Sequence, residues 1–195
     1  MSEFEELRSQ CVVCTKCELW KTRKRVVFGE GNPHAEILFV GEAPGANEDE
    51  QSKPFVGAAG KNLDKYLAKV GLNREEVFIA NVIKCRPPEN RNPSANEIKK
   101  CTPWLYEQIR QINPKVICPM GNFAAKYILS GCDTEKMANI QGISYLHGKV
   151  VEMEIHGEKR TVIPLYHPAA LIYNRHLEPE MEKDLEFIKG EIKKI

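Results

Sequence analysis

Four cysteines restrict how this chain can fold, because their spacing is that of ligands to a single metal centre. Two of them form the short pair Cys14-x2-Cys17, and the other two, Cys85 and Cys101, lie much further along the chain. Sets of four thiolates bind zinc ions and iron–sulfur clusters. If all four cysteines bind one centre, the N-terminal segment must lie against the part of the fold that carries Cys85 and Cys101.

These residues leave the centre open between Zn2+ and a [4Fe–4S] cluster. A structural zinc site would usually have a second short Cys-x2-Cys pair, so the wide gap between Cys85 and Cys101 favours the cluster. Cys11 extends the first pair to a ferredoxin-like run, but Lys21 stands where that run needs its fourth cysteine. We therefore expect Cys11 not to be a ligand and the cluster to have a structural role.

Composition indicates a globular protein, because 42% of the 195 residues are hydrophobic and 28% are charged. This length suits one domain over residues 1–195. The odd count of seven cysteines argues against a secreted disulfide scaffold. The apolar runs are much shorter than the roughly 20 residues of a membrane span, and the acidic N-terminus lacks the apolar part of a signal peptide. We therefore expect a cytoplasmic protein that does not contact a membrane.

The charge pattern limits the ligands that the chain can bind. The net charge is only +1, so any nucleic-acid contact must come from a local basic patch. Residues 57–61 resemble part of a P-loop. However, Phe55 stands where that motif needs its first glycine, and neither serine nor threonine follows Lys61. We therefore exclude binding of a nucleoside triphosphate through this segment.

Hydrophobic periodicity predicts strands that alternate with helices. Short apolar runs predict strands at residues 36–41, 77–83 and 116–120. We expect helices at residues 3–10, 58–70, 94–112, 122–129 and 178–195, and a hairpin of strands at residues 149–155 and 160–163. This order predicts the α/β class, as a three-layer α/β/α fold with a central, mainly parallel sheet.

Two local signals refine the helix expected at residues 94–112. Ser94 and Glu97 have the spacing of a capping box, so the helix should begin there. Pro103 lies inside this helix and should kink or interrupt it, because proline lacks the N–H of a helical hydrogen bond.

Polar residues follow the predicted strands at their carboxyl ends. Glu42 follows the first strand, Asn81 lies near the end of the second, and His167 comes shortly after the last. Parallel sheets bind their ligands at this edge. We therefore expect these three side chains to converge on one site.

Four motifs, in the same order, resemble those of the uracil-DNA glycosylase superfamily. They are Gly41–Gly45 with Glu48, Lys53–Gly60, Asn81–Pro93 and His167–Leu171. The version here is similar to the family 4 enzymes, which carry a [4Fe–4S] cluster. Cys14, Cys17, Cys85 and Cys101 fall where that family has its cluster ligands, so the resemblance implies the same cofactor. It extends from about Cys14 to the C-terminal helix.

The resemblance implies a DNA-repair hydrolase of base excision repair. Such an enzyme cleaves the N-glycosidic bond of deoxyuridine in single- or double-stranded DNA, releases uracil and leaves an abasic site. The resemblance assigns catalysis to two residues. His167 donates a hydrogen bond to uracil O2, and Glu42 orients the attacking water. Other branches of the superfamily carry aspartate where this chain has Ala43, so the carboxylate role falls to Glu42.

The resemblance also implies how the base is bound. Phe55 stacks on the uracil ring, and Asn81 pairs with N3–H and O4. Glu48 lies near the same edge and excludes the methyl group of thymine. Backbone amides at Gly41 and Ala43 complete the pocket.

By resemblance, the loop after His167 enters the minor groove of DNA. Leu171 or Tyr173 fills the gap that the flipped base leaves, and Arg175 meets a phosphate. Arg86 contacts DNA or serves the cluster electrostatically. Lys84 and Arg91 are further candidate DNA contacts.

Two other functions compete with this one. The first is a non-catalytic iron–sulfur or zinc module that binds nucleic acid. The second is a relative that captures the abasic product covalently, but such relatives need an additional basic loop, for which residues 46–53 leave no room. We expect a monomer. We also expect a replication clamp as a partner, although no sequence motif indicates one.

Overall fold

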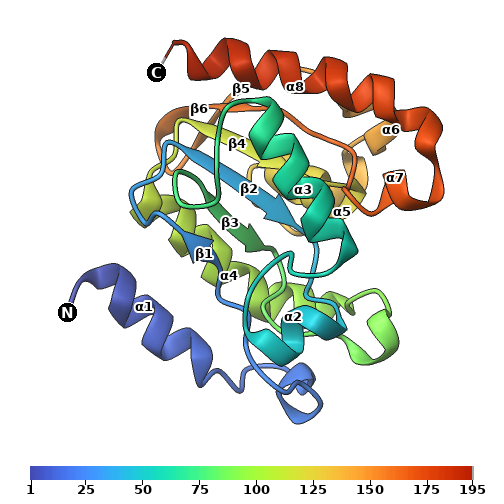
Figure 1. Ribbon diagram of the computed structural model, residues 1–195. Coiled ribbons are helices and arrows are strands. Elements are labelled where there is room, and N and C mark those ends of the chain that lie inside the picture. Colours follow the sequence, from blue (N-terminus) through green and yellow to red (C-terminus); the bar gives the residue numbers. More distant parts are fainter. Residues whose placement is uncertain (195) are drawn as a thin grey trace.

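A six-stranded sheet forms the centre of the protein, with strand order β1-β3-β2-β4-β6-β5 (Figure 1). The computed structural model describes residues 1–194. Four strands are parallel to one another, and the edge strands pair antiparallel to their neighbours. The bounds are β1 (Glu30–Gly31), β2 (Ile37–Gly41), β3 (Phe78–Asn81), β4 (Val116–Pro119), β5 (Val151–Ile155) and β6 (Glu158–Val162). The mainly parallel sheet is thus confirmed.

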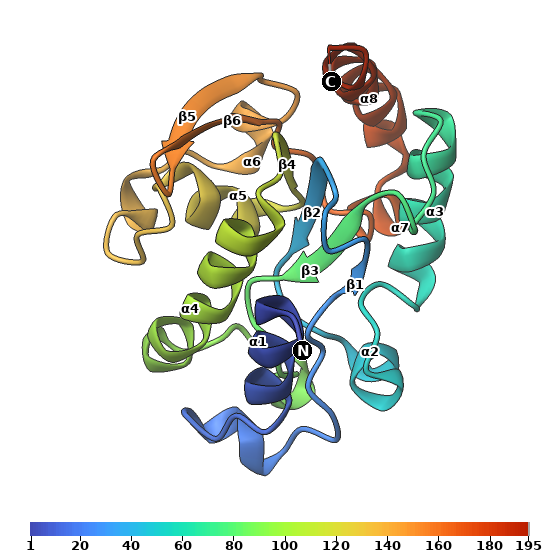
Figure 2. The same cartoon turned by 90° about the vertical axis from the view of Figure 1, so that its left-hand side faces the viewer.

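Helices cover both faces of this sheet, which confirms the three-layer α/β/α fold (Figures 1 and 2). Alternate residues of β2 point to opposite faces, so Leu38 and Val40 join one core while Ile37 and Phe39 join the other. On the first face lie α1 (Glu3–Val12), α4 (Ala95–Ile112) and α5 (Asn122–Leu129). On the second lie α3 (Ala58–Lys69) and α8 (Glu178–Ile192).

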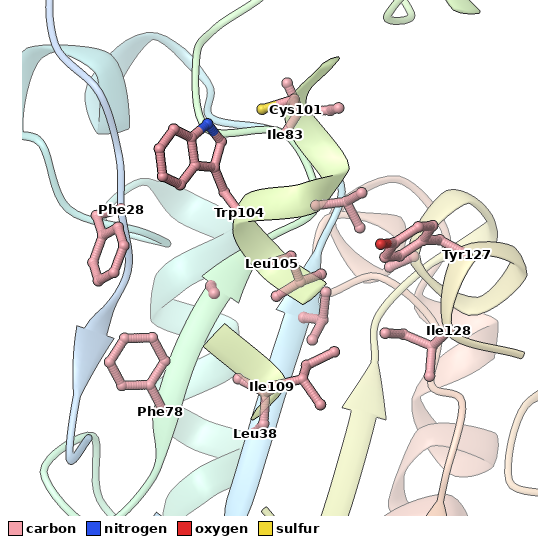
Figure 3. Close-up of a cluster of buried hydrophobic side chains, with 14 of the residues drawn as sticks. Phe28, Leu38, Phe78, Ile83, Cys101, Trp104, Leu105, Ile109, Tyr127 and Ile128 are labelled. Atoms are coloured by element: carbon pink, nitrogen blue, oxygen red, sulfur yellow. The ribbon is translucent and has the colours of Figure 1, made fainter. Parts of the chain in front are cut away.

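Each core is filled by large apolar side chains from these helices. Those of the first core include Trp104, Leu105, Ile109, Tyr127 and Ile128 (Figure 3). Those of the second include Leu63, Tyr66, Leu67, Met181, Leu185 and Ile188. The burial of one face of α3 and of α8 explains why hydrophobic periodicity predicted these two helices.

Helix α4 begins at the predicted capping box but does not break at Pro103. Ser94 Oγ accepts from the backbone N–H of Glu97 at 3.3 Å, and Glu97 Oε2 accepts from that of Ser94 at 2.8 Å. The helix continues without interruption from Ala95 to Ile112, so Pro103 does not interrupt it, and the alternative of a kink there stays a prediction. Buried side chains on both sides of Pro103, such as Cys101 and Leu105, hold the two halves against the same core.

Three short helices lie in the connections, namely α2 (Ala46–Gln51), α6 (Ile143–Leu146) and α7 (Ala170–Tyr173). Hydrophobic periodicity could not predict α2, because its six residues are almost all polar.

The β5–β6 hairpin turns at His156 and Gly157, which both have positive φ. The predicted C-terminal helix ends at Ile192, and its last expected residue, 195, lies outside the described residues. No helix within residues 1–194 is long and apolar enough to cross a membrane.

Candidate active site and cysteine cluster

The carboxyl ends of β2 and β3 bring three predicted site residues into contact. Gly41 and Asn81 are partners in the parallel ladder. A Cβ atom on Gly41 would lie 2.3 Å from Asn81 Oδ1 and 2.6 Å from Phe55 Cζ. Both distances are far below van der Waals contact, so only glycine fits here. Phe55 and the amide of Asn81 therefore meet directly over Gly41.

The backbone of Phe55 is held in a left-handed conformation, with φ of 52°. Such a conformation is strained for an aromatic residue and persists only where its surroundings fix it. Arg74 donates hydrogen bonds to the carbonyls of Pro54 and Phe55. A Cβ on Gly60 would lie 1.8 Å from the Phe55 carbonyl oxygen, so α3 packs directly against this segment. Arg74 lies outside the sequence motifs, and its support of the site was not predicted.

His167 lies across from Phe55, with its ring centroid 5.6 Å from that of Phe55 and an angle of 32° between the ring planes. It follows Leu165, which extends the parallel sheet through a bridge to Met120. The Pro168 carbonyl accepts a hydrogen bond from Asn62 Nδ2 at 3.0 Å, which ties the segment to α3. The sequence analysis missed Asn62 as well.

The hydrogen bonding of His167 fixes its tautomer. Burial lowers its pKa to about 4, and the nearby carboxylate of Glu48 opposes that shift only in part. The imidazole is therefore neutral at pH 7. Its Nδ1 atom accepts from the backbone N–H of Ala169 at 3.1 Å, so the single ring proton is on Nε2. The ring thus offers a neutral N–H donor to a ligand.

The two carboxylates of the first motif have different surroundings. Glu42 is half-buried, and burial raises its pKa. Glu48 instead accepts from three backbone N–H groups, those of Gly45 at 3.1 Å, Val56 at 3.0 Å and Gly57 at 3.1 Å. Glu48 therefore joins the loop after β2 to the loop that carries Phe55. Its predicted role against thymine stays a prediction.

A surface hollow beside Phe55 does not contain the predicted catalytic groups. Its lining includes Glu30, Lys53, Lys61 and Arg74 but neither Glu42, Asn81 nor His167. Phe55, Asn81 and His167 instead lie near one another around Gly41, whereas the place of Glu42 in the site stays a prediction.

The predicted cysteines lie together near the C-terminal end of α1. One hollow is lined by Cys11, Cys14, Cys17, Cys85 and Cys101, together with Lys16, Arg23, Lys84, Lys100 and Trp104. The N-terminal segment therefore packs against β3 and α4, as the cysteine spacing predicted. Within residues 1–194, no three His, Cys, Asp or Glu side chains could hold a single metal ion.

Hydrogen-bond donors reach two of the sulfur atoms. The backbone N–H of Lys84 donates to Cys101 Sγ at 3.2 Å, and Arg23 donates to Cys85 Sγ at 3.3 Å and to the Cys14 carbonyl at 2.6 Å. Burial raises the pKa of Cys85 to about 11, although Arg23 acts in the opposite direction. The sequence analysis missed Arg23.

The predicted DNA contacts differ in exposure. Leu171 is only 7% exposed and belongs to the second core, whereas Tyr173 is 89% exposed. Arg175 is exposed. Arg86 donates to Asn90 Oδ1 at 2.8 Å.

Two further residues that were predicted to contact DNA are buried or already paired within the protein. Lys84 is only 1% exposed, so the expectation that it contacts DNA is wrong. Arg91 forms a two-point ion pair with Glu97, at 2.8 and 2.7 Å.

Fold and site together define an α/β protein that gathers Phe55, Asn81 and His167 at the carboxyl ends of its parallel strands. The sequence model of the uracil DNA glycosylase superfamily matches residues 28–189. The chain therefore belongs to the uracil-DNA glycosylase superfamily, as its motifs predicted.

Curated relatives support the family 4 resemblance. The chain is 47% identical to a type-4 uracil-DNA glycosylase of Archaeoglobus fulgidus, over 98% of this chain and 94% of the relative. It is 42% identical to a type-4 uracil-DNA glycosylase of Thermotoga maritima, over 97% of each chain. Identity to a type-5 uracil-DNA glycosylase of Pyrobaculum aerophilum is lower, at 29% over 86% of this chain and 76% of the relative.

Proposed function

We propose that this protein hydrolyses the N-glycosidic bond of deoxyuridine in DNA, releasing uracil and leaving an abasic site. Family membership and the type-4 relatives support this activity. The structural observation that carries it is the neutral imidazole of His167, which lies across from Phe55 and offers an Nε2–H donor to a ligand. A flipped base needs this combination of a stacking ring, a hydrogen-bonding amide and a donor.

Base recognition falls to Phe55 and Asn81. Phe55 is 5% exposed and Asn81 is 2% exposed, so both recognition groups are shielded from water by the protein. The Asn81 amide can accept from uracil N3–H and donate to O4. Cytosine has no N3–H and carries an amino group at position 4, which leaves buried polar groups unpaired. Asn81 thereby favours uracil over cytosine.

Bond cleavage leaves negative charge on the uracil and positive charge on the sugar. His167 stabilises the leaving anion by donating from Nε2 to O2, and a neutral donor retains its proton as charge develops. Glu42, when ionised, orients water and stabilises the cationic sugar. Glu48 and Arg74 position the loop that carries Phe55.

DNA binding uses the exposed loop after His167. Tyr173 projects into solvent from the end of α7, whereas Leu171 packs in the core. We therefore assign the wedge to Tyr173 and a phosphate contact to Arg175.

The cysteine hollow fits a [4Fe–4S] cluster bound by Cys14, Cys17, Cys85 and Cys101. N–H donors to two of the sulfurs are typical of iron-bound thiolates. Within the described residues, the buried indole Nε1 of Trp104 has no hydrogen-bond partner, although Trp104 lines the hollow (Figure 3). A cluster would supply an acceptor for it. When bound, the cluster would cross-link the N-terminal segment to β3 and α4.

The test is release of uracil from a synthetic strand with one deoxyuridine, under single-turnover conditions. His167→Gln should abolish release while DNA affinity remains, because the imidazole contacts only the flipped base. An unaffected rate would favour the non-catalytic binding module.

We further propose that the chain acts in the cytoplasm as a single-domain monomer and that a replication clamp is a partner.

A further inference from the structure

Lys84 is a buried amine without an acidic partner. It is 1% exposed, and its Nζ donates to the Asn81 carbonyl at 2.8 Å and to Gln108 Oε1 at 2.5 Å. Within residues 1–194, no aspartate or glutamate forms an ion pair with it. An isolated buried charge is strongly destabilising, so Lys84 requires a source of negative charge.

Lys84 helps to line the cysteine hollow, which is a source of such negative charge. Its own backbone N–H donates to Cys101 Sγ at 3.2 Å. A [4Fe–4S] centre with four thiolate ligands carries net negative charge. Lys84 therefore has the position of a counter-charge to that centre.

The same side chain reaches the base-recognition strand. Its bond to the Asn81 carbonyl holds the last residue of β3, whose amide faces Phe55 over Gly41. Gln108 is fixed in turn, because its Nε2 donates to the Phe28 carbonyl at 2.9 Å. A continuous set of hydrogen bonds thus runs from the cysteine hollow through Lys84 to Asn81.

We propose that Lys84 is a positioning residue that couples the iron–sulfur centre to uracil recognition. Its charge is balanced by the cluster, and its hydrogen bond sets the position of Asn81. This inference rests on the proposed function, and it goes beyond it by giving the centre an influence on base binding. Loss of the cluster leaves Lys84 unbalanced and thereby weakens the binding of uracil.

Three variants of the full-length protein separate the two contacts of Lys84. Lys84→Met removes both the charge and the hydrogen bond to Asn81. Gln108→Glu places a negative charge beside Nζ but leaves the bond to Asn81 intact, although the Phe28 carbonyl loses its donor. Lys100→Met is the matched control, because Lys100 also lines the hollow but is exposed. Each variant is measured for iron content, midpoint potential of the cluster and the inhibition constant of free uracil.

We expect Lys84→Met to lower the midpoint potential of the cluster, because removal of a nearby positive charge disfavours reduction. We also expect it to weaken uracil inhibition about tenfold, which is the effect of one lost hydrogen bond. Gln108→Glu should lower the potential but keep the wild-type inhibition constant. Lys100→Met should change neither, because solvent screens its charge.

An iron-loaded Lys84→Met variant with either the wild-type potential or the wild-type uracil inhibition would overturn the coupling. If Lys84→Met retains no iron, Gln108→Glu decides, and an unchanged potential in that variant overturns the proposal. A wild-type protein that binds no iron, or that uracil does not inhibit, would instead refute the proposed function and this inference with it.

Discussion

The backbone N–H of Ala169 donates a hydrogen bond to His167 Nδ1 over 3.1 Å, and this contact decides which ring nitrogen can act on a substrate. Ala169 has φ of −69°, which proline adopts without strain. Ala169→Pro therefore removes the donor and frees the tautomer of His167. We expect uracil release to slow about tenfold, the effect of one hydrogen bond. Ala169→Gly keeps the N–H and serves as the control, so equal rates in both variants would contradict this role.

Burial of His167 makes the stability of the protein depend on pH. Its pKa falls from 6.5 in the unfolded chain to about 4 in the folded protein. Between these values the unfolded chain binds a proton that the folded protein does not, so the free energy of unfolding rises with pH and reaches its full value above 6.5. His167→Gln removes this titration. Denaturant unfolding across this range should therefore show a weaker pH dependence in the variant, and equal slopes would refute the assignment.

Gly41→Ala should close the base pocket. The added Cβ would lie 2.3 Å from Asn81 Oδ1 and 2.6 Å from Phe55 Cζ, so both recognition groups must move. We expect uracil release to fall by about two orders of magnitude, equivalent to about 2.7 kcal/mol. Gly190→Ala is the control, because its Cβ meets nothing within 4 Å in α8. That variant should keep full activity and gain up to about 1 kcal/mol of stability.

The sequence predicted five of the six strands and the five longer helices, because these depend on local periodicity or on capping signals, whereas the two-residue edge strand β1 was not predicted. The sequence could not predict contacts between segments that are distant along the chain. Arg74, which lies in the segment after α3, holds the Phe55 backbone, and Asn62 holds Pro168. Neither residue belongs to a motif, so only the fold shows their role.

Burial was the second property that the sequence did not show. Lys84 was expected to contact DNA, but the segment after β3 turns inward, and the Lys84 amine donates hydrogen bonds to Asn81 and Gln108. Leu171 and Tyr173 are two positions apart, yet a short helix buries one and exposes the other. Such alternation depends on where the helix begins, which sequence spacing alone did not fix.

The cysteine hollow predicts which thiols hold iron. Cys85→Ala should lose iron and lower the melting temperature, because the link between the N-terminal segment and β3 is broken. Cys118 is a buried core cysteine outside the hollow, so Cys118→Ala should keep its iron. Cys11→Ala tests the expectation that Cys11 is not a ligand, and loss of iron in that variant would place Cys11 in the ligand set.

The exposure of Tyr173 and the burial of Leu171 separate DNA binding from folding. Tyr173→Ala should change the free energy of unfolding by less than about 0.5 kcal/mol, because the ring touches little of the protein. It should weaken binding to deoxyuridine-containing duplex about tenfold, through loss of stacking in the gap left by the flipped base. Leu171→Ala should instead destabilise the fold by about 2–5 kcal/mol. Chemical denaturation and equilibrium DNA titration of both variants measure the two effects. We expect DNA binding to depend on the exposed Tyr173 and stability to depend on the buried Leu171. A Leu171 variant with native stability and weak DNA binding would therefore show that Leu171 is the wedge.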